Sequence, residues 1–259
     1  MLLKDKVGIV SGVGPGLGKE IALAFAREGA DLVLGARTES YLAEVQAEVE
    51  GLGRRARYAP TDITDQAQCD RLVQTAIDEF GRVDVLVNNA FAADVFQLFE
   101  DVDLDAWRRI VEVNLFGSLQ LTKSVIPVMK DQGGGSIVFV NSMIVRKILP
   151  LQGGYATSKG ALLTAAHVLA KELGPYKIRV NSIVPGWMWG PSVQGYFALM
   201  EKQTGKSVQD QYDEIASQIA LGLIPTDDDC ANAAVFFASD LSSVITGQAL
   251  DVNGGEVFH

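Results

Sequence analysis

The sequence contains 259 residues, of which 48% are hydrophobic, and it carries a formal net charge of −10. That size and composition fit one α/β domain with a single large core, and the acidic balance argues against a nucleic-acid partner, which would require a basic face. No run of about eighteen apolar residues occurs, and residues 1–6 lead into a strand without a signal-peptide apolar region. We therefore expect a cytoplasmic protein that is not membrane-bound.

Cysteine and histidine are too few and too scattered to suggest a metal site or a disulfide. Cys69 and Cys230 have no CxxC spacing, and His167 and His259 form no cluster with them. We therefore expect two free thiols and no bound metal.

The first element is an apolar strand over residues 6–11 that runs directly into a glycine-rich turn. Apolar residues then recur at helical spacing over 17–28, and Gly29 ends that helix. Glycines allow a tight turn and a close approach to a pyrophosphate, whose charge is stabilised by free N–H groups at a helix N-terminus. Ser11 offers a hydroxyl at the same turn. Glycine also marks ordinary loops, but the order of strand, turn and helix favours phosphate binding.

Strand-like apolar runs alternate with helical stretches along the rest of the chain. Because these runs do not alternate with polar residues, they are typical of a parallel sheet that helices cover on both faces, with right-handed crossovers. We expect a Rossmann-like, doubly wound parallel β-sheet of the α/β class in a single domain over 1–259. The expected strands are 6–11, 32–34, 57–59, 83–87, 136–141, 179–184 and 249–252.

A pair of side chains suited to acid–base chemistry lies in the second half of the chain. Tyr155 and Lys159 are four residues apart in a stretch that runs without proline to Gly174, so they should meet on one face of a helix. A neighbouring ammonium favours the phenolate, and lowering a phenol pKa by about three units requires about 4 kcal/mol. With Ser142 upstream, the pattern predicts a device that moves a proton on and off a carbonyl oxygen. The alternative is a half-buried ring beside a solvated lysine.

The longest interruption of the strand and helix pattern runs from 187 to about 225. Proline, glycine and several aromatic residues there precede a polar, helix-prone stretch. Long connections in compact domains are usually functional, so we interpret 187–225 as a lid or substrate segment.

Several independent motifs occur along the chain in an order that is informative about its family. They are Ser11-Gly12-x-x-x-Gly16-x-Gly18, Asp62 within Thr-Asp-Ile, Asn88-Asn89-Ala90, Asn114 within Val-Asn-Leu-Phe-Gly, the set Ser142, Tyr155 and Lys159, and Pro185-Gly186. In this order and spacing, the chain from Lys4 to Gly255 resembles the short-chain dehydrogenase/reductase family, which comprises nicotinamide-dependent oxidoreductases on a Rossmann sheet. Any one motif is weak evidence, but together they make the resemblance specific.

The resemblance implies roles for four catalytic residues. Tyr155 would be the acid or base, and Ser142 would hold the same substrate oxygen. Lys159 would lower the tyrosine pKa and bind the nicotinamide ribose, while Asn114 would anchor a water that links Lys159 to solvent. Each residue also has a plainer interpretation: Ser142 as a strand-end cap, Asn114 as a helix hydrogen bond, and Lys159 as a surface charge.

The resemblance also implies a dinucleotide site, with Asp62 at the adenine amino group and Pro185-Gly186 beside the nicotinamide. The predicted cofactor-binding residues are Ser11, Gly12, Gly16, Leu17, Gly18, Arg37, Asp62, Ile63, Asn89, Ala90, Tyr155, Lys159, Pro185, Gly186 and Met188.

The end of the second strand bears on which cofactor is used. Ala36 stands where an acid would accept the ribose hydroxyls of NAD, and Arg37 follows with a guanidinium suited to a phosphate. We therefore expect NADP(H) in preference to NAD(H), which stays possible. The alternative is that Arg37 pairs with Glu39 or faces solvent.

The chain departs from the family pattern at three positions. Phe91 replaces a glycine after Asn-Asn-Ala, so either the backbone runs differently there or the ring faces the substrate. Gly190 stands where a threonine would lie near the nicotinamide amide, and that contact would pass to the backbone or to Ser192. Asn141 replaces a common serine, a change expected to be benign.

The segments expected to line the substrate pocket are rich in apolar and aromatic residues, which favours an apolar or ring-bearing ketone or secondary alcohol. Alternatively, half of them are packing beneath the lid. Arg146 and Lys147 would either attract an anionic group or be solvated loop charges. A 3-oxoacyl thioester therefore competes with a bulky hydrophobic ketone. The residues in question are Phe91, Val95, Phe96, Ile144, Val145, Leu149, Trp187, Trp189, Tyr196, Phe197 and Met200.

A different class of function stays open at this stage, because relatives of this fold sometimes bind the nucleotide and act as regulators or scaffolds without turnover. No member of the catalytic set is missing here, which favours an enzyme. The resemblance also implies a homotetramer or dimer, with the helices around Asn114 and Tyr155 and the segment 251–259 at interfaces.

Overall fold

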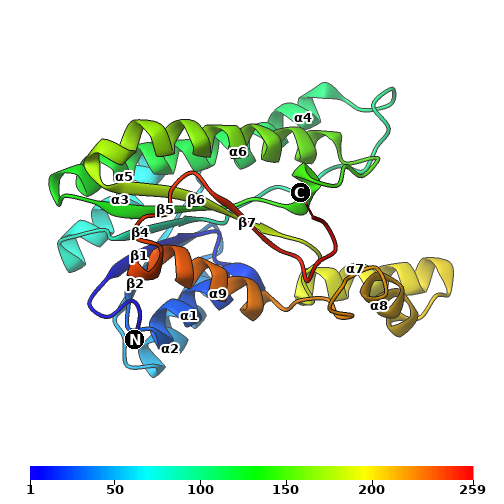
Figure 1. The fold of residues 1–259 in the computed structure, drawn as a ribbon, viewed down its shortest axis with the longest axis horizontal. Helices are drawn as coiled ribbons and strands as arrows, with labels where there is room; N and C mark the ends of the chain where they lie inside the picture. The colour runs from blue at the N-terminus through cyan, green and yellow to red at the C-terminus, as the bar shows by residue number, and fades with distance from the viewer. Residues whose placement is uncertain (259) are drawn as a thin grey trace.

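A computed structural model describes residues 1–258 of the chain, so His259 lies outside the described residues. Seven parallel strands form one sheet in the order β3-β2-β1-β4-β5-β6-β7 (Figure 1). Every strand predicted from the sequence is confirmed, with shifts of one or two residues at the ends. The strands are β1 (Val7–Ser11), β2 (Asp31–Ala36), β3 (Ala56–Pro60), β4 (Val85–Asn88), β5 (Gly135–Val140), β6 (Ile178–Pro185) and β7 (Ala249–Val252).

Helices cover both faces of the sheet, as expected for a doubly wound fold (Figure 1). One face carries α1 (Leu17–Arg27), α2 (Glu39–Gly51) and α9 (Asp227–Ala238). The other carries α3 (Gln66–Phe80), α4 (Leu104–Val111), α5 (Ser118–Asp131) and α6 (Gly153–Leu173). A π-helical stretch, η1 (Glu112–Gly117), joins α4 to α5. Short 3₁₀ turns are η2 (Met143–Val145), η3 (Gly174–Tyr176) and η4 (Asp240–Ser242).

The apolar strand runs divide their side chains between two core layers. In β2, Leu32 and Leu34 pack toward α1 and α9, whereas Val33 packs into the layer beneath α3, α5 and α6. Successive residues of a strand point to opposite faces, so a run without polar interruptions fills both layers. This explains why the central strands lack polar alternation.

The predicted lid segment is mostly helical. It contains α7 (Pro191–Thr204) and α8 (Val208–Ala216), which lie beyond α9 at the end of the sheet (Figure 1). Its base is closed by a hydrogen bond from the Trp189 N–H to the Pro225 carbonyl, at 2.7 Å. Within residues 1–258, no helix combines the length and apolarity that crossing a membrane would require.

Candidate active site

The glycine turn after β1 is built by close main-chain approaches. Gly12 has a φ of +76° and donates its N–H to the Gly35 carbonyl at 2.7 Å. A β-carbon at Gly12 would overlap the main chain of Ala90, and one at Gly18 would overlap the Gly12 carbonyl. Asn89 Nδ2 holds that same carbonyl at 2.8 Å. The turn is therefore fixed in shape, and only glycine fits two of its positions.

The helix that follows this turn starts without a side-chain cap. Gly16 is the N-cap of α1, with a φ of 111°, and among residues 1–258 no side-chain capping bond is made to this helix start. A helix start of this kind is suited to a phosphate, because its N–H groups are free and its dipole favours negative charge. Ser11, which was predicted to contribute a hydroxyl here, instead donates to the Val87 carbonyl inside the sheet at 3.3 Å.

Two adjoining cavities open at the carboxyl ends of the strands and share the glycine turn. The inner cavity has a volume of about 220 Å³ and reaches Ser142, Tyr155, Lys159, Pro185, Gly186 and Met188. The outer cavity, of about 730 Å³, reaches Arg37, Asp62, Ile63 and Ala90. Gly12 and Asn89 line both. All the predicted cofactor-binding residues except Ser11 thus line one cavity or the other, and the glycine cradle between them fits a dinucleotide.

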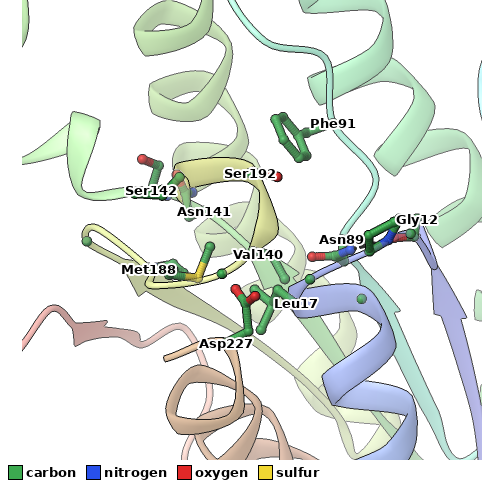
Figure 2. Close-up of a pocket in the computed structure, with 18 of the residues that line it drawn as sticks. Gly12, Leu17, Asn89, Phe91, Val140, Asn141, Ser142, Met188, Ser192 and Asp227 are labelled. Carbon is green, nitrogen blue, oxygen red and sulfur yellow. Dashed lines mark hydrogen bonds between the residues drawn. The ribbon is translucent and has the colours of Figure 1, made fainter. Parts of the chain in front are cut away.

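Ser142, Tyr155 and Lys159 come together at the inner cavity (Figure 2 shows Ser142 at its edge). Ser142 follows β5, while the other two lie one turn apart on α6. The Lys159 ammonium donates to the Val140 carbonyl at 2.8 Å and lies 5.6 Å from the centre of the Tyr155 ring. Lys159 is only 2% exposed, so it is not the solvated surface lysine of the alternative interpretation.

Burial governs the protonation of this pair. It raises the pKa of the Tyr155 phenol, an effect that a hydrogen bond with Ser142 partly opposes. It also lowers the pKa of Lys159 from 10.5 to about 8. The direction for Tyr155 is opposite to the one predicted from the sequence, because Lys159 directs its ammonium at Val140 while the phenolate would be poorly hydrated. At neutral pH the structure therefore presents a protonated phenol next to an ammonium.

Asn114 lies in the π-helical stretch η1 and is completely buried. Its amide group exchanges hydrogen bonds with the main chain of Ala92, at 2.6 and 3.0 Å, and donates to Ser158 Oγ at 3.0 Å. Ser158 Oγ in turn donates to the Tyr155 carbonyl at 2.7 Å. The Asn114 side chain therefore ties the loop after β4 to α6.

Two carboxylates near the site escaped the sequence analysis. Asp94 Oδ2 accepts the main-chain N–H of Tyr155 at 2.6 Å. Asp227, the first residue of α9, lines the inner cavity. A β-carbon at Gly190 would overlap Asp227 Oδ2, so the carboxylate fills the space that a side chain at 190 would need. The unusual glycine at 190 was the one sequence signal for this arrangement, but nothing in the sequence connected it with position 227.

The structure also accounts for the two other departures from the family pattern, at Phe91 and Asn141. The Phe91 ring is 57% exposed, lines both cavities and lies edge-on to Tyr155, with ring centres 6.4 Å apart. It therefore lies beside the phenol at the edge of the inner cavity. Asn141 is buried, and its Oδ1 accepts the Ser142 N–H at 3.0 Å, which supports the serine.

Arg146 and Lys147 are both paired with acids of the C-terminal segment, although the Lys147 side chain is still 39% exposed. Arg146 pairs with Asp251 at 3.4 Å, and Lys147 pairs with Glu256 at 3.0 Å. Both anchor the C-terminal segment beside the site. Of the two alternatives, attraction of an anionic group is the less favoured one, because both charges are already paired.

The aromatic residues of the lid divide between packing and exposure. Phe197 is buried against Trp187, Trp189 and Tyr212, and together they form a small core of their own. Tyr196 is 47% exposed and stacks on Trp187. Part of the predicted substrate wall is therefore lid core, as the alternative interpretation held.

A family model described as enoyl-(acyl carrier protein) reductase matches residues 12–256, which include the glycine turn, the Ser142, Tyr155 and Lys159 set and the lid. The chain belongs to the short-chain dehydrogenase/reductase family. It is therefore an oxidoreductase that transfers a hydride between a nicotinamide cofactor and a CH–OH or C=O group. The predicted fold class and reaction class are both confirmed.

Relatives of this chain act on chemically diverse compounds. The chain is 34% identical to 3-oxoacyl-(acyl-carrier-protein) reductase FabG of Thermotoga maritima, over 100% of both chains. The structure of L-sorbose reductase from Gluconobacter frateurii, complexed with NADPH and L-sorbose, superposes with a TM-score of 0.95 at 27% identity over 100% of both chains. A 7α-hydroxysteroid dehydrogenase complexed with NADH and 7-oxo glycochenodeoxycholic acid gives a TM-score of 0.88 at 32% identity, over 99% of this chain and 96% of that one.

Proposed function

We propose that this chain is a reductase that uses NADPH to reduce a hydrophobic, ring-bearing ketone, with Tyr155 as the acid. The observation that carries this proposal is that the Tyr155 phenol lines the same cavity as Ser142 and Phe91. Burial raises the pKa of the phenol, which favours the form that can donate a proton. A carbonyl oxygen in that cavity would have both hydroxyls to accept from. Negative charge that develops on it would be met by a proton and a hydrogen bond.

The residues around the glycine turn would hold the dinucleotide, with its diphosphate at the start of α1. When bound, the cofactor supplies the hydride. Lys159 would bind the nicotinamide ribose, and its ammonium would favour loss of the phenol proton. Ser142 would orient the carbonyl, and Asn114 would keep α6 in register with the loop after β4.

The NADPH preference is supported by the position of Arg37. Its side chain is exposed at the rim of the outer cavity, and within residues 1–258 it forms no ion pair, with Glu39 or any other acid. Ala36 before it offers no carboxylate to ribose hydroxyls. The relatives differ in the cofactor that they bind, since one structure holds NADPH and another holds NADH.

The size and lining of the inner cavity support a compact apolar substrate. Phe91 is the aromatic surface closest to Tyr155, and it is exposed to the space a ring would occupy. A 3-oxoacyl thioester is the second candidate, supported by the similarity to a relative with that name. Arg146 and Lys147 argue against it, because their pairing leaves no free cation there for the phosphate of an acyl carrier.

Several further expectations stay proposals. The segment 187–225 would act as the lid, the protein would assemble as a dimer or tetramer, and it would be cytoplasmic. A regulator without turnover is disfavoured, because all four predicted catalytic residues are present. Sedimentation velocity and cell fractionation test the assembly and the location.

The test is absorbance at the nicotinamide band, with NADPH and NADH against cyclic ketones, steroids, aliphatic ketones and 3-oxoacyl thioesters. We expect turnover of ring-bearing ketones, a higher kcat/KM with NADPH than with NADH, and a loss of about 10²–10⁴-fold in Tyr155→Phe. Preferential turnover of thioesters would replace the substrate proposal. Turnover by Tyr155→Phe equal to that of wild type would show that Tyr155 is not the acid.

A further inference from the structure

A carboxylate lies where the phosphates of the dinucleotide are expected. Asp227 is only 8% exposed, and the part that is accessible lines the inner cavity. Figure 2 shows its carboxylate pointing into that cavity, close to Leu17 and Met188. Asp227 belongs to α9, which packs against α1, so a helix far along the chain brings an acid to the glycine turn.

Two glycines make room for this carboxylate. A β-carbon at Gly16 would lie 3.3 Å from Asp227 Oδ2, and one at Gly190 would overlap the same oxygen. Gly16 is the N-cap of α1, the helix start at which the diphosphate charge is expected. The carboxylate and a bound diphosphate must therefore be close neighbours.

Asp227 has no structural role in capping or pairing within the fold of residues 1–258. The capping box of α9 is made by Thr226 and Asp229, whose N–H groups and side chains bond each other at 2.8 and 3.2 Å. Asp228 pairs with Arg27 at 2.9 Å. Among the described residues, neither Asp227 oxygen has a hydrogen bond or an ion pair. A buried carboxylate without a partner is costly, which indicates a role toward a ligand.

The surroundings of Asp227 favour its neutral form. Burial raises the pKa of its carboxyl, and the charge of Glu20 on α1 raises it further. The glycine turn and residues 185–193 contribute no charged side chain. Lys159 lines the far part of the same cavity. The other charged groups on packed elements are engaged elsewhere: Lys19 with Glu48, Arg27 with Asp228, Asp229 in the capping box, Arg179 with Ser239 and Ser242, and Asp251 with Arg146.

We propose that Asp227 is a contact of the bound dinucleotide and takes up a proton from solvent when the dinucleotide binds. The inference rests on the proposed function only in requiring that this cavity binds NADP(H) or NAD(H). An ionised carboxylate repels a diphosphate, whereas a protonated carboxyl donates a hydrogen bond to it. The complex then holds up to one more proton than the separate molecules, depending on pH, so cofactor affinity falls as the pH rises between the pKa values of the free and the complexed carboxyl.

Calorimetry measures this proton directly, without turnover. NAD⁺ and NADP⁺ are titrated separately into the full-length protein between pH 5 and 6.5, in buffers of different ionisation enthalpy. In this range Lys159, with its pKa of about 8, stays charged. Wild type is expected to take up a fraction of a proton per dinucleotide. Asp227→Asn is expected to show less uptake than wild type with the same ligand, and to bind on the order of tenfold more tightly at pH 8.

Asp228→Asn is the matched control, because it removes the same charge from the same helix turn outside the cavity. It should keep wild-type proton uptake. Weaker binding by Asp227→Asn would mean that the ionised carboxylate accepts a hydrogen bond from the cofactor, and would overturn the inference. Equal uptake in wild type and Asp227→Asn would also overturn it. If Asp227→Asn does not fold, the wild-type measurement decides alone. The phosphates of NAD⁺ do not titrate between pH 5 and 6.5, so binding of NAD⁺ to wild type without proton uptake would overturn the inference. Absence of any dinucleotide binding would instead refute the proposed function.

Discussion

The carboxylate of Asp94 accepts a hydrogen bond from the main-chain N–H of Tyr155 at 2.6 Å, across 61 residues of sequence. Gln152, the N-cap of α6, makes no side-chain capping bond, so Asp94 performs this task from the loop after β4. Asn114 ties down the same loop through Ala92. The first turn of the helix that carries the phenol is thus held from outside the helix.

This contact leads to a prediction for two variants of Asp94. Asp94→Ala should lower stability by about 1 kcal/mol, as the loss of a helix cap does, and should lower kcat by about tenfold because the phenol is less well positioned. Asp94→Asn keeps an acceptor oxygen and should recover most of kcat. Urea unfolding and steady-state kinetics measure both. If Asp94→Asn is as slow as Asp94→Ala, the negative charge and not the capping bond is what matters.

The glycine turn allows a matched pair of substitutions. A β-carbon at Gly18 would overlap the Gly12 carbonyl and lie 2.7 Å from Asn89 Nδ2, whereas at Gly14 it would meet nothing within 4 Å. Gly18→Ala should therefore destabilise the protein by about 1–3 kcal/mol and weaken dinucleotide binding. Gly14→Ala should leave stability nearly unchanged. Thermal unfolding and fluorescence titration with NADPH compare them, and equal effects would contradict the steric argument.

Lys159 should make stability depend on pH in alkaline solution. Its pKa is about 8 in the folded protein and near the ordinary 10.5 when unfolded. Between these values Lys159 holds more protons in the unfolded chain, so its contribution to stability rises with pH, by roughly 3 kcal/mol in total. Lys159→Met should lack this rise and be more stable than wild type at pH 7, while losing activity. Urea unfolding of wild type and Lys159→Met from pH 7 to 10.5 checks this through the difference between the two proteins, because burial raises the pKa of the Cys69 and Cys230 thiols and lowers the stability of both proteins above pH 9. A difference that stays constant over this range would contradict the prediction.

The exposed guanidinium at the rim of the outer cavity should decide between the two cofactors. Arg37→Ala should lower kcat/KM with NADPH by about tenfold, since a charge-assisted bond to the 2′-phosphate is lost, and change the value with NADH little. Arg71→Ala, an exposed position on α3 outside both cavities, is the control. An equal loss with both cofactors would show that Arg37 does not read the phosphate.

Phe91 should influence which substrates are accepted rather than the chemistry. Because its ring is exposed and lies 6.4 Å from that of Tyr155, Phe91→Ala should cost little stability. It should raise KM for ring-bearing ketones by about tenfold, as lost apolar contact does, with a small effect on short aliphatic ketones. Kinetics with matched cyclic and linear ketones measure this. A uniform drop in kcat would instead indicate that the ring positions Tyr155.

The elements, and the meeting of Ser142, Tyr155 and Lys159 at one cavity, could be predicted because their signals are local. Apolar runs define the strands, and the glycines of the first turn sit next to the helix they start. Tyr155 and Lys159 share a helix face by their spacing alone, and Ser142 follows closely after a strand whose neighbour in the sheet is fixed by the fold. These patterns depend on the periods of the backbone, which a sequence carries directly.

The charges around the site were decided only by the tertiary structure. Sequence spacing placed Lys159 next to Tyr155, but burial and the Val140 carbonyl determined where the ammonium points and in which direction each pKa moves. Asp94 and Asp227 reach the site from 61 and 72 residues away from Tyr155, on elements that only packing brings together. A pKa and an unpaired carboxylate depend on desolvation and on through-space distance, and neither is encoded in any local pattern of residues.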